Sequence, residues 1–237
     1  IVRLLSCFLH EGITLMAVVR FAVCYHAHHC AVVNDNRHVD YQEFYALAQR
    51  LSRLLYHNYH LESGHHVALF CRNHLVSALL LPALSRLGVH VKLLNTDLSD
   101  EQLAQVMSRS FALFIYDEEL TQANNLYAMC SMVSCEKLLE SIETHNFVCD
   151  ATLPHIKRGG NISVMTGGSS GKYKEAARQT GIVQFLPPFF SLLCDLHIDN
   201  YRSVLIGLPF YHGFGLATLL VSFVMGKTVC LLRRFDA

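Results

Sequence analysis

The stretch HHVALFCRNHLVSALLLPALSRLGVHVKLL, residues 65–94, decides the predicted fold. A short apolar run at 67–71 is typical of a buried strand. Asn73 then opens a predicted helix that continues to residue 87, and Gly88 follows it in the position that favours a helix C-cap. A second apolar run at 89–94 is the next predicted strand. This order of strand, helix and strand predicts one parallel βαβ unit.

The same alternation extends on both sides of this unit. Apolar residues recur at helical spacing over 41–56. A helix is predicted after Leu98, with Ser99 as its N-cap and Gln102 three residues later. Further strands are predicted at 111–116, 131–133, 162–165, 203–207 and 228–232, and further helices at 136–142, 181–196 and 213–225. The predicted fold class is α/β, with a mostly parallel, helix-covered sheet whose ligands gather at the carboxyl ends of the strands.

The N-terminal part, residues 1–35, is predicted as a helical segment packed on a main domain that covers 36–237. Its apolar stretch is interrupted by Arg3, Glu11 and Arg20, and no run in the chain reaches the length of a membrane span. We therefore expect no transmembrane segment.

Composition bounds the class of protein. Of 237 residues, 52% are apolar, which is enough for a sizeable core. The 19 basic side chains balance the 19 acidic ones, so nothing predicts the basic face of a nucleic-acid-binding protein. The nine cysteines are an odd number with no Cys-x-x-Cys pair, which favours free thiols in a reducing, cytoplasmic compartment.

A loop rich in glycine and hydroxyl groups, TGGSSGKYK at 166–174, follows the predicted strand at 162–165. Glycine lets the backbone approach a ligand closely. Backbone amides and Ser or Thr hydroxyls donate to phosphate oxygens, and lysine adds positive charge. The loop therefore suits a polyphosphate, and a solvent-exposed Gly/Ser turn is the alternative.

The loop does not fit the Walker A motif. The first glycine of that motif would stand at Thr166, and Tyr173 follows Lys172 where a small hydroxyl should hold magnesium. The GxGxxG motif is absent as well, so a Walker-type nucleotidase is disfavoured.

The loop instead resembles the phosphate loop of the adenylate-forming superfamily, which includes AMP-forming acyl- and aryl-CoA synthetases, luciferases and nonribosomal adenylation domains. Its pattern there is roughly [ST][ST]G[ST]TGxPK. Two positions depart from it, because Gly167 replaces a hydroxyl residue and Tyr173 replaces a proline that would stiffen the turn. The matching positions, outright or by type, are Thr166, Gly168, Ser169, Ser170, Gly171 and Lys174.

A second element carries the same resemblance. LPFYHGFGL at 208–216 is followed by GKTV at 226–229 and RFD at 234–236, in the order and spacing of the superfamily. Upstream residues also match the order of elements in the superfamily. They are Tyr41, Glu43, Asn73, Gly88 and Asn95. Residues 30–237 thus resemble the first half of the large N-terminal, AMP-binding domain.

The resemblance implies an AMP-forming acid–thiol ligase of the acyl-CoA synthetase type. Such an enzyme converts a carboxylic acid and ATP to an acyl-adenylate and passes the acyl group to coenzyme A. It implies ATP, Mg²⁺ and CoA, with the Mg²⁺ ligand outside this chain. The expected ATP-phosphate-binding residues are Thr166, Gly167, Gly168, Ser169, Ser170, Gly171 and Lys174. The expected acyl or CoA pocket residues are His212, Gly213, Phe214 and Gly215.

The resemblance places the superfamily's adenine, ribose and main catalytic elements beyond Ala237, the last residue of the chain. We therefore expect a fragment of the enzyme that is inactive alone, and we assign no catalytic residue within it. Three alternatives stay open: a carrier-protein or amine acceptor, a non-catalytic phosphate-binding α/β module, and self-association through surface that the rest of the domain would cover. His212 is alternatively a buried structural histidine, and Gly213 and Gly215 alternatively serve helix packing.

No metal site is predicted. His26, His28, His29 and Cys30 cluster, but no second ligand group follows at metal-binding spacing. Cys130 and Cys135 are expected to be ordinary thiols.

Overall fold

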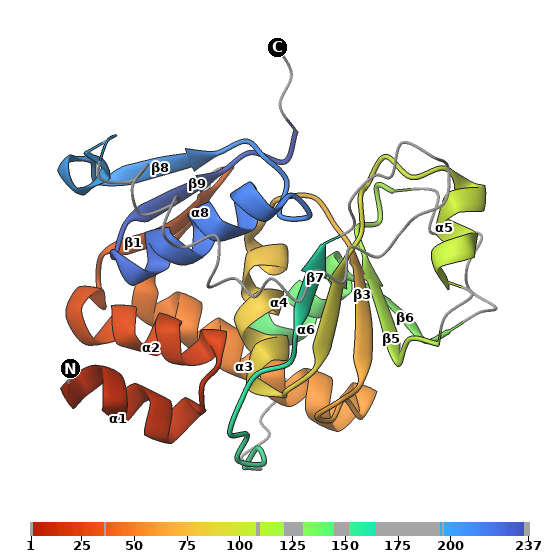
Figure 1. The fold of residues 1–237 in the computed structure, drawn as a ribbon, viewed down its shortest axis with the longest axis horizontal. Helices are drawn as coiled ribbons and strands as arrows, with labels where there is room; N and C mark the ends of the chain where they lie inside the picture. The colour runs from red at the N-terminus through yellow and green to blue at the C-terminus, as the bar shows by residue number, and fades with distance from the viewer. Residues whose placement is uncertain are drawn as a thin grey trace.

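The structure, a computed structural model, contains two β-sheets with helices packed around them (Figure 1). It describes residues 2–35, 37–107, 110–120, 130–144, 152–164, 195 and 197–234. Three parts of the chain that the sequence analysis used lie outside the described residues. They are the loop at 166–174, the predicted helix at 181–196 except residue 195, and the end of the chain from Phe235 to Ala237. The α/β class and the mostly parallel pairing of strands are confirmed.

Five parallel strands form the first sheet, in the order β6-β5-β3-β4-β7. They are β3 (His66–Phe70), β4 (His90–Leu93), β5 (Leu113–Tyr116), β6 (Met132–Ser134) and β7 (Ile162–Val164). The sequence analysis predicted all five. Because the strands are parallel, their carboxyl ends all meet at one edge of the sheet, which is called the carboxyl edge below.

Both faces of the first sheet are covered. The covering helices are α3 (Tyr41–Tyr59), α4 (Leu75–Arg86), α5 (Asp100–Met107) and α6 (Cys135–Glu143). Val67 and Leu69 of β3 belong to the core that contains side chains of α3, α4 and α6, whereas Ala68 and Phe70 belong to a second core with side chains of α5. This alternation buries every other residue on each face, which explains why the strand is apolar throughout.

The predicted cap of α5 is present. The Ser99 hydroxyl accepts a hydrogen bond from the Gln102 amide (3.3 Å), and the Gln102 side chain accepts one from the Ser99 amide (3.0 Å). These two bonds satisfy amide groups that the first turn of a helix leaves without a partner.

The second sheet has the order β2-β1-β9-β8 and was only half predicted. Its strands are β1 (Cys30–Asn34), β2 (Arg37–Asp40), β8 (Ser203–Ile206) and β9 (Thr228–Leu231), with the 3₁₀ turn η3 (Ile198–Asn200) ahead of β8. The antiparallel pair β1–β2 was missed, although β8 and β9 were predicted. Residues of β1 pair in parallel with residues of β9, which lie almost two hundred positions later in the sequence. A local sequence pattern cannot predict so distant a strand partner.

The N-terminal residues form two helices, α1 (Val2–Glu11) and α2 (Leu15–His26), before the chain enters β1. Residues 30–34 are thus a strand and not part of a helical segment. The division into an N-terminal segment and a main domain stays a prediction. None of the helices in the described part of the chain has the length and apolar character that a membrane span needs.

Glu11 fixes these N-terminal helices to the rest of the molecule. Its carboxylate is buried and accepts hydrogen bonds from Arg20 (3.2 Å), Arg86 (2.9 Å) and the Tyr45 hydroxyl. These partners come from α2, α4 and α3. A buried carboxylate is tolerated here because it is paired with two arginines and hydrogen-bonded to a third group.

Asn73 joins the first sheet to the chain that enters α8 (Gly213–Val224). It lies between β3 and α4 and is 2% exposed. Its side-chain amide donates to the Leu208 carbonyl (2.9 Å), and its side-chain oxygen accepts from the Phe210 amide (3.0 Å). The predicted helix start at Asn73 is therefore wrong by two residues, because its side chain makes this link and His74 becomes the N-cap.

We predict that Asn73→Ala destabilises the protein by about 2 kcal/mol, because the buried Phe210 amide would lose its acceptor and the Leu208 carbonyl would lose its donor. Urea unfolding followed by circular dichroism measures this free energy. Asn73→Asp should destabilise the protein less than Asn73→Ala does, because the aspartate keeps the acceptor for the Phe210 amide and loses only the donor to the Leu208 carbonyl.

The matched control is Asn58→Ala, at an exposed position of α3, which should change stability by less than about 0.5 kcal/mol. Equal effects of the two alanine substitutions would contradict the proposed role of Asn73.

Candidate functional site

The predicted phosphate loop begins just beyond the end of β7. This strand pairs in parallel with β4, and Val164 lies opposite Leu93. The chain therefore leaves β7 at the carboxyl edge, where ligands gather in parallel sheets. The positions of the loop residues themselves lie outside the described part of the chain, and their phosphate-binding role stays a prediction. They are Thr166, Gly167, Gly168, Ser169, Ser170, Gly171 and Lys174.

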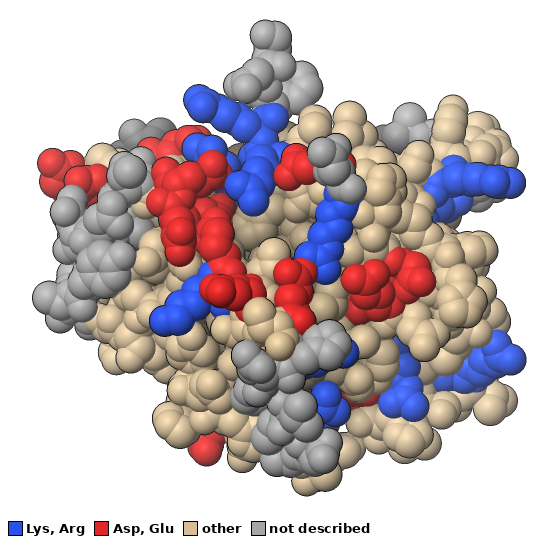
Figure 2. All heavy atoms as spheres, turned by 180° about the vertical axis from the view of Figure 1, so that it is seen from behind, with Lys and Arg blue, Asp and Glu red and all other residues tan. Residues whose placement is uncertain are grey.

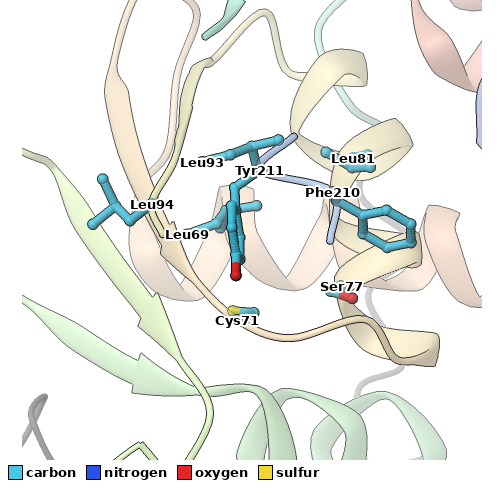
Figure 3. Close-up of a pocket in the computed structure, with 8 residues that line it drawn as sticks. All are labelled: Leu69, Cys71, Ser77, Leu81, Leu93, Leu94, Phe210 and Tyr211. Atoms are coloured by element: carbon cyan, nitrogen blue, oxygen red, sulfur yellow. The ribbon is translucent and has the colours of Figure 1, made fainter. Parts of the chain in front are cut away.

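The segment 208–212 lies against the same edge. Phe210 and Tyr211 are buried and cover a small cavity of about 10 Å³ (Figure 3). The Tyr211 hydroxyl shares a hydrogen bond with the Thr96 hydroxyl (3.3 Å), three residues after β4. Burial raises the pKa of Tyr211, so its hydroxyl stays neutral at physiological pH. The other residues around the cavity are Leu69, Cys71, Ser77, Leu81, Leu93 and Leu94.

Leu93 connects the two predicted motifs. Its backbone lies opposite Val164, next to the start of the loop, and its side chain lines the cavity beneath Tyr211. The strand that leads into the glycine-rich loop and the segment that carries His212 thus share Leu93 as a common neighbour, although they are more than forty residues apart in the sequence.

His212 occupies the N-cap position of α8 with an exposed side chain. Its imidazole makes no capping hydrogen bond, and its ring lies 4.9 Å from the Tyr211 ring, centroid to centroid. The alternative of a buried structural histidine is therefore wrong. Phe214, in the first turn of α8, is 50% exposed. Both side chains are accessible to a ligand, and their role in an acyl or CoA pocket stays a prediction.

The two glycines of this element differ in their surroundings. A Cβ atom on Gly215 would come within 2.5 Å of the Pro209 carbonyl oxygen and 2.6 Å of the Leu208 carbonyl oxygen. Gly215 therefore lets the first turn of α8 pack against the preceding backbone, as the alternative interpretation held. A Cβ atom on Gly213 would meet nothing within 4 Å, so packing does not explain that glycine.

A wider cleft lies elsewhere, between β1 and the start of α4. It has a volume of about 430 Å³ and contains none of the predicted site residues. Its walls carry both signs of charge, from Asp35, Arg37 and Arg233. The face drawn in Figure 2 likewise has Lys and Arg side chains among Asp and Glu side chains, without a continuous basic surface.

The carboxyl edge also carries a buried polar cluster that the sequence analysis missed. Cys71, Asp117 and Cys135 each come directly after a strand, namely β3, β5 and β6. Their sulfur and oxygen atoms lie within 4.8 Å of one another. The signal that would have found them is their shared position at the ends of adjacent parallel strands.

His74 completes this cluster through a hydrogen bond of 2.7 Å between its Nε2 and Asp117 Oδ1. Burial alone would lower the pKa of His74, but hydrogen bonds to Asp117 and Cys135 raise it to about 10. Burial would raise the pKa of Asp117, but the hydrogen bond and charge of His74 hold it below its usual value. The hydrogen bond between them therefore favours a proton on His74 Nε2 and an ionised carboxylate on Asp117.

Comparison with known proteins agrees with this architecture. A model of the AMP-binding enzyme family matches residues 20–237, which includes the whole predicted main domain up to Ala237. The 2-succinylbenzoate–CoA ligase of Bacillus licheniformis is 26% identical in an alignment of 215 positions that covers 87% of this chain and 42% of the ligase. The chain thus spans less than half the length of that curated relative.

Two solved structures share the fold. O-succinylbenzoate coenzyme A synthetase from Bacillus subtilis, in complex with ATP and magnesium, has a TM-score of 0.73 at 22% identity, over 93% of this chain and 58% of that one. The inhibitor-bound N-terminal domain of FACL13 from Mycobacterium tuberculosis has a TM-score of 0.78 at 21% identity. The match covers 94% of this chain and 58% of that domain's chain. With a family match over nearly its whole length, the chain belongs to the AMP-binding enzyme family.

Proposed function

We infer that this chain supplies the ATP-phosphate-binding loop and part of the acyl pocket of an AMP-forming acid–thiol ligase of the acyl-CoA synthetase type. The observation that carries the proposal is that Leu93, at the carboxyl edge, lies opposite Val164 at the end of β7 and lines the same cavity as Tyr211. Family membership supports the reaction class, and the curated relative that it matches is a CoA ligase.

In the proposed reaction, a carboxylate oxygen attacks the α-phosphorus of ATP and pyrophosphate leaves. The thiol of CoA then takes the acyl group from the acyl-adenylate, and AMP and a proton are released. Negative charge develops on the phosphates in the first step, so fixed donors and cations there lower the barrier. The hydroxyls of Thr166, Ser169 and Ser170 and the ammonium group of Lys174 would supply them. The amides of Gly167, Gly168 and Gly171 would complete the cradle around the β- and γ-phosphates.

The hydroxyls, amides and lysine of this loop suit the phosphate groups of a magnesium-bound triphosphate. The loop has no carboxylate that could bind the magnesium ion itself. Magnesium would neutralise phosphate charge, with its protein ligand outside this chain. His212 and Phe214 would contact the acyl group or the pantetheine arm, since both side chains are exposed beside the cavity wall at Tyr211. The acid is proposed only as a carboxylic acid.

We predict that Lys174→Ala raises the KM for ATP by about 10- to 100-fold in the ligase that carries this chain, since a charge-assisted hydrogen bond to phosphate is lost. Acid-dependent ATP–pyrophosphate exchange measures it. The control is Lys172→Ala, two positions away in the same loop, which is expected to face solvent. An unchanged KM in the Lys174 variant would refute the assignment.

Calorimetric titration of pyrophosphate into the purified chain separates a phosphate-binding loop from an exposed turn. Ser169→Ala and Lys174→Ala should each weaken binding, and Lys172→Ala should not. Equal binding by all variants would point to an exposed turn. Phosphate binding without acid-dependent exchange in the longer ligase would favour the non-catalytic module.

We also predict that the 237-residue chain alone catalyses no ATP–pyrophosphate exchange. The resemblance places the adenine- and ribose-binding elements and the catalytic lysine in the part of the enzyme beyond Ala237. The Bacillus subtilis 2-succinylbenzoate–CoA ligase, assayed with its own substrate, is the positive control. Acid-dependent turnover by the chain alone would overturn this prediction.

A further inference from the structure

We propose that Cys71, Cys135 and Asp117 bind a zinc ion at the carboxyl edge of the first sheet. The three side chains follow β3, β6 and β5, which are neighbours in the sheet. Their ligand atoms lie within 4.8 Å of one another, and they are the one such group among the described residues. This site differs from the sequence-based expectation of no metal.

The donor chemistry selects zinc. Two cysteine sulfurs and one carboxylate oxygen suit a borderline-soft, tetrahedral ion, whereas magnesium and calcium prefer oxygen alone. The Cys71 and Cys135 sulfur atoms lie 3.3 Å apart. Zinc holds two thiolates about 3.8 Å apart, so the sulfurs need to separate by about half an ångström.

Asp117 is positioned as a ligand by its other contacts. Its Oδ2 accepts the Arg72 backbone amide (2.7 Å), and its Oδ1 accepts His74 Nε2 (2.7 Å). Each carboxylate oxygen keeps a second lone pair that can reach a metal. His74 Nδ1 accepts the Ser77 amide (3.3 Å), so both ring nitrogens are engaged, and the histidine orients Asp117 in the manner of an outer-shell partner.

The fourth position has room for one small ligand. Cys71 is partly exposed and lines the cavity of about 10 Å³ beneath Tyr211, whose volume matches about one water molecule (Figure 3). Asp117 and Cys135 are 0% and 1% exposed. The cavity therefore lies next to one of the three proposed ligands, Cys71.

Zinc binding releases the protons of the two cysteine thiols. Burial raises the pKa of Cys71 to about 11 and that of Cys135 well above its usual value, so both thiols are neutral in the metal-free protein. On binding, Zn²⁺ forms two bonds to sulfur and one to oxygen, and the two thiols release two protons to solvent. No electron is transferred.

The test titrates Zn²⁺ into reduced, metal-free protein against a chromophoric chelator. We expect one zinc ion per chain, and at least about 100-fold weaker binding in Cys71→Ser and in Cys135→Ser. Cys7→Ser and Cys24→Ser are matched controls, because that sulfur pair is 4.0 Å apart and belongs to no group of three ligands among the described residues. These controls should bind zinc as the unchanged protein does.

Measurements on the unchanged protein keep the proposal testable if the serine variants fail to fold. Cobalt should give the thiolate charge-transfer band and the visible bands of a tetrahedral site. Zinc should protect Cys71 and Cys135 from alkylation, mapped by mass spectrometry, and raise the Tm by several degrees, while magnesium should do neither.

Three results would overturn the proposal. One is the absence of stoichiometric zinc binding to the reduced protein. Another is zinc protection of other cysteines in place of Cys71 and Cys135. The last is isolation of the pair as a disulfide whose reduced form binds no zinc, which would make the cluster a redox pair.

Discussion

The buried amide of Asn73 is the interaction on which the arrangement of the candidate site depends. It stands after β3 of the first sheet and bonds the backbone of Leu208 and Phe210, which lead into α8 over the second sheet. A second buried asparagine, Asn34 of β1, accepts the amide of Leu75 at the start of α4 (2.7 Å). Both links are made by side chains that satisfy otherwise unpaired backbone groups, so the sheets are joined through polar complementarity as well as apolar contact.

The parallel topology concentrates chemistry at one edge. Every strand of the first sheet ends on the same side, so β7 ends there and the thiol–carboxylate cluster after β3, β5 and β6 lies there. The Tyr211–His212 segment packs against the same edge. The order β6-β5-β3-β4-β7 separates two parts of it. The proposed ATP loop begins next to β4, while the proposed zinc ligands follow the three strands at the other end of the sheet. Both proposals use the general property that parallel sheets leave polar groups for ligands at this edge.

Local signals predicted the first sheet well and the second one poorly. The strands β3 and β5 are apolar on both faces and stand beside amphipathic helices, a pattern that is visible directly in the sequence. By contrast, β1 depends on pairing with β9, far along the chain. Asn73 and Gly215 show the same limit within single residues. Asn73 was interpreted as a helix start and proves to hydrogen-bond a distant backbone segment, and for Gly215 the structure supports the packing alternative that the sequence left open.

The sequence by itself determined the α/β class, the parallel βαβ succession and the two motifs that point to an AMP-forming ligase, because hydrophobic periodicity and glycine-rich loops are local properties. Only the tertiary structure decided that β7 and the Tyr211–His212 segment share Leu93 as a neighbour, that His212 is exposed, and that Cys71, Cys135 and Asp117 meet around one point. The physical reason is that strand order and side-chain burial are set by contacts between residues far apart in the chain. A sequence pattern shows which residues can make such contacts, whereas the fold selects the partner.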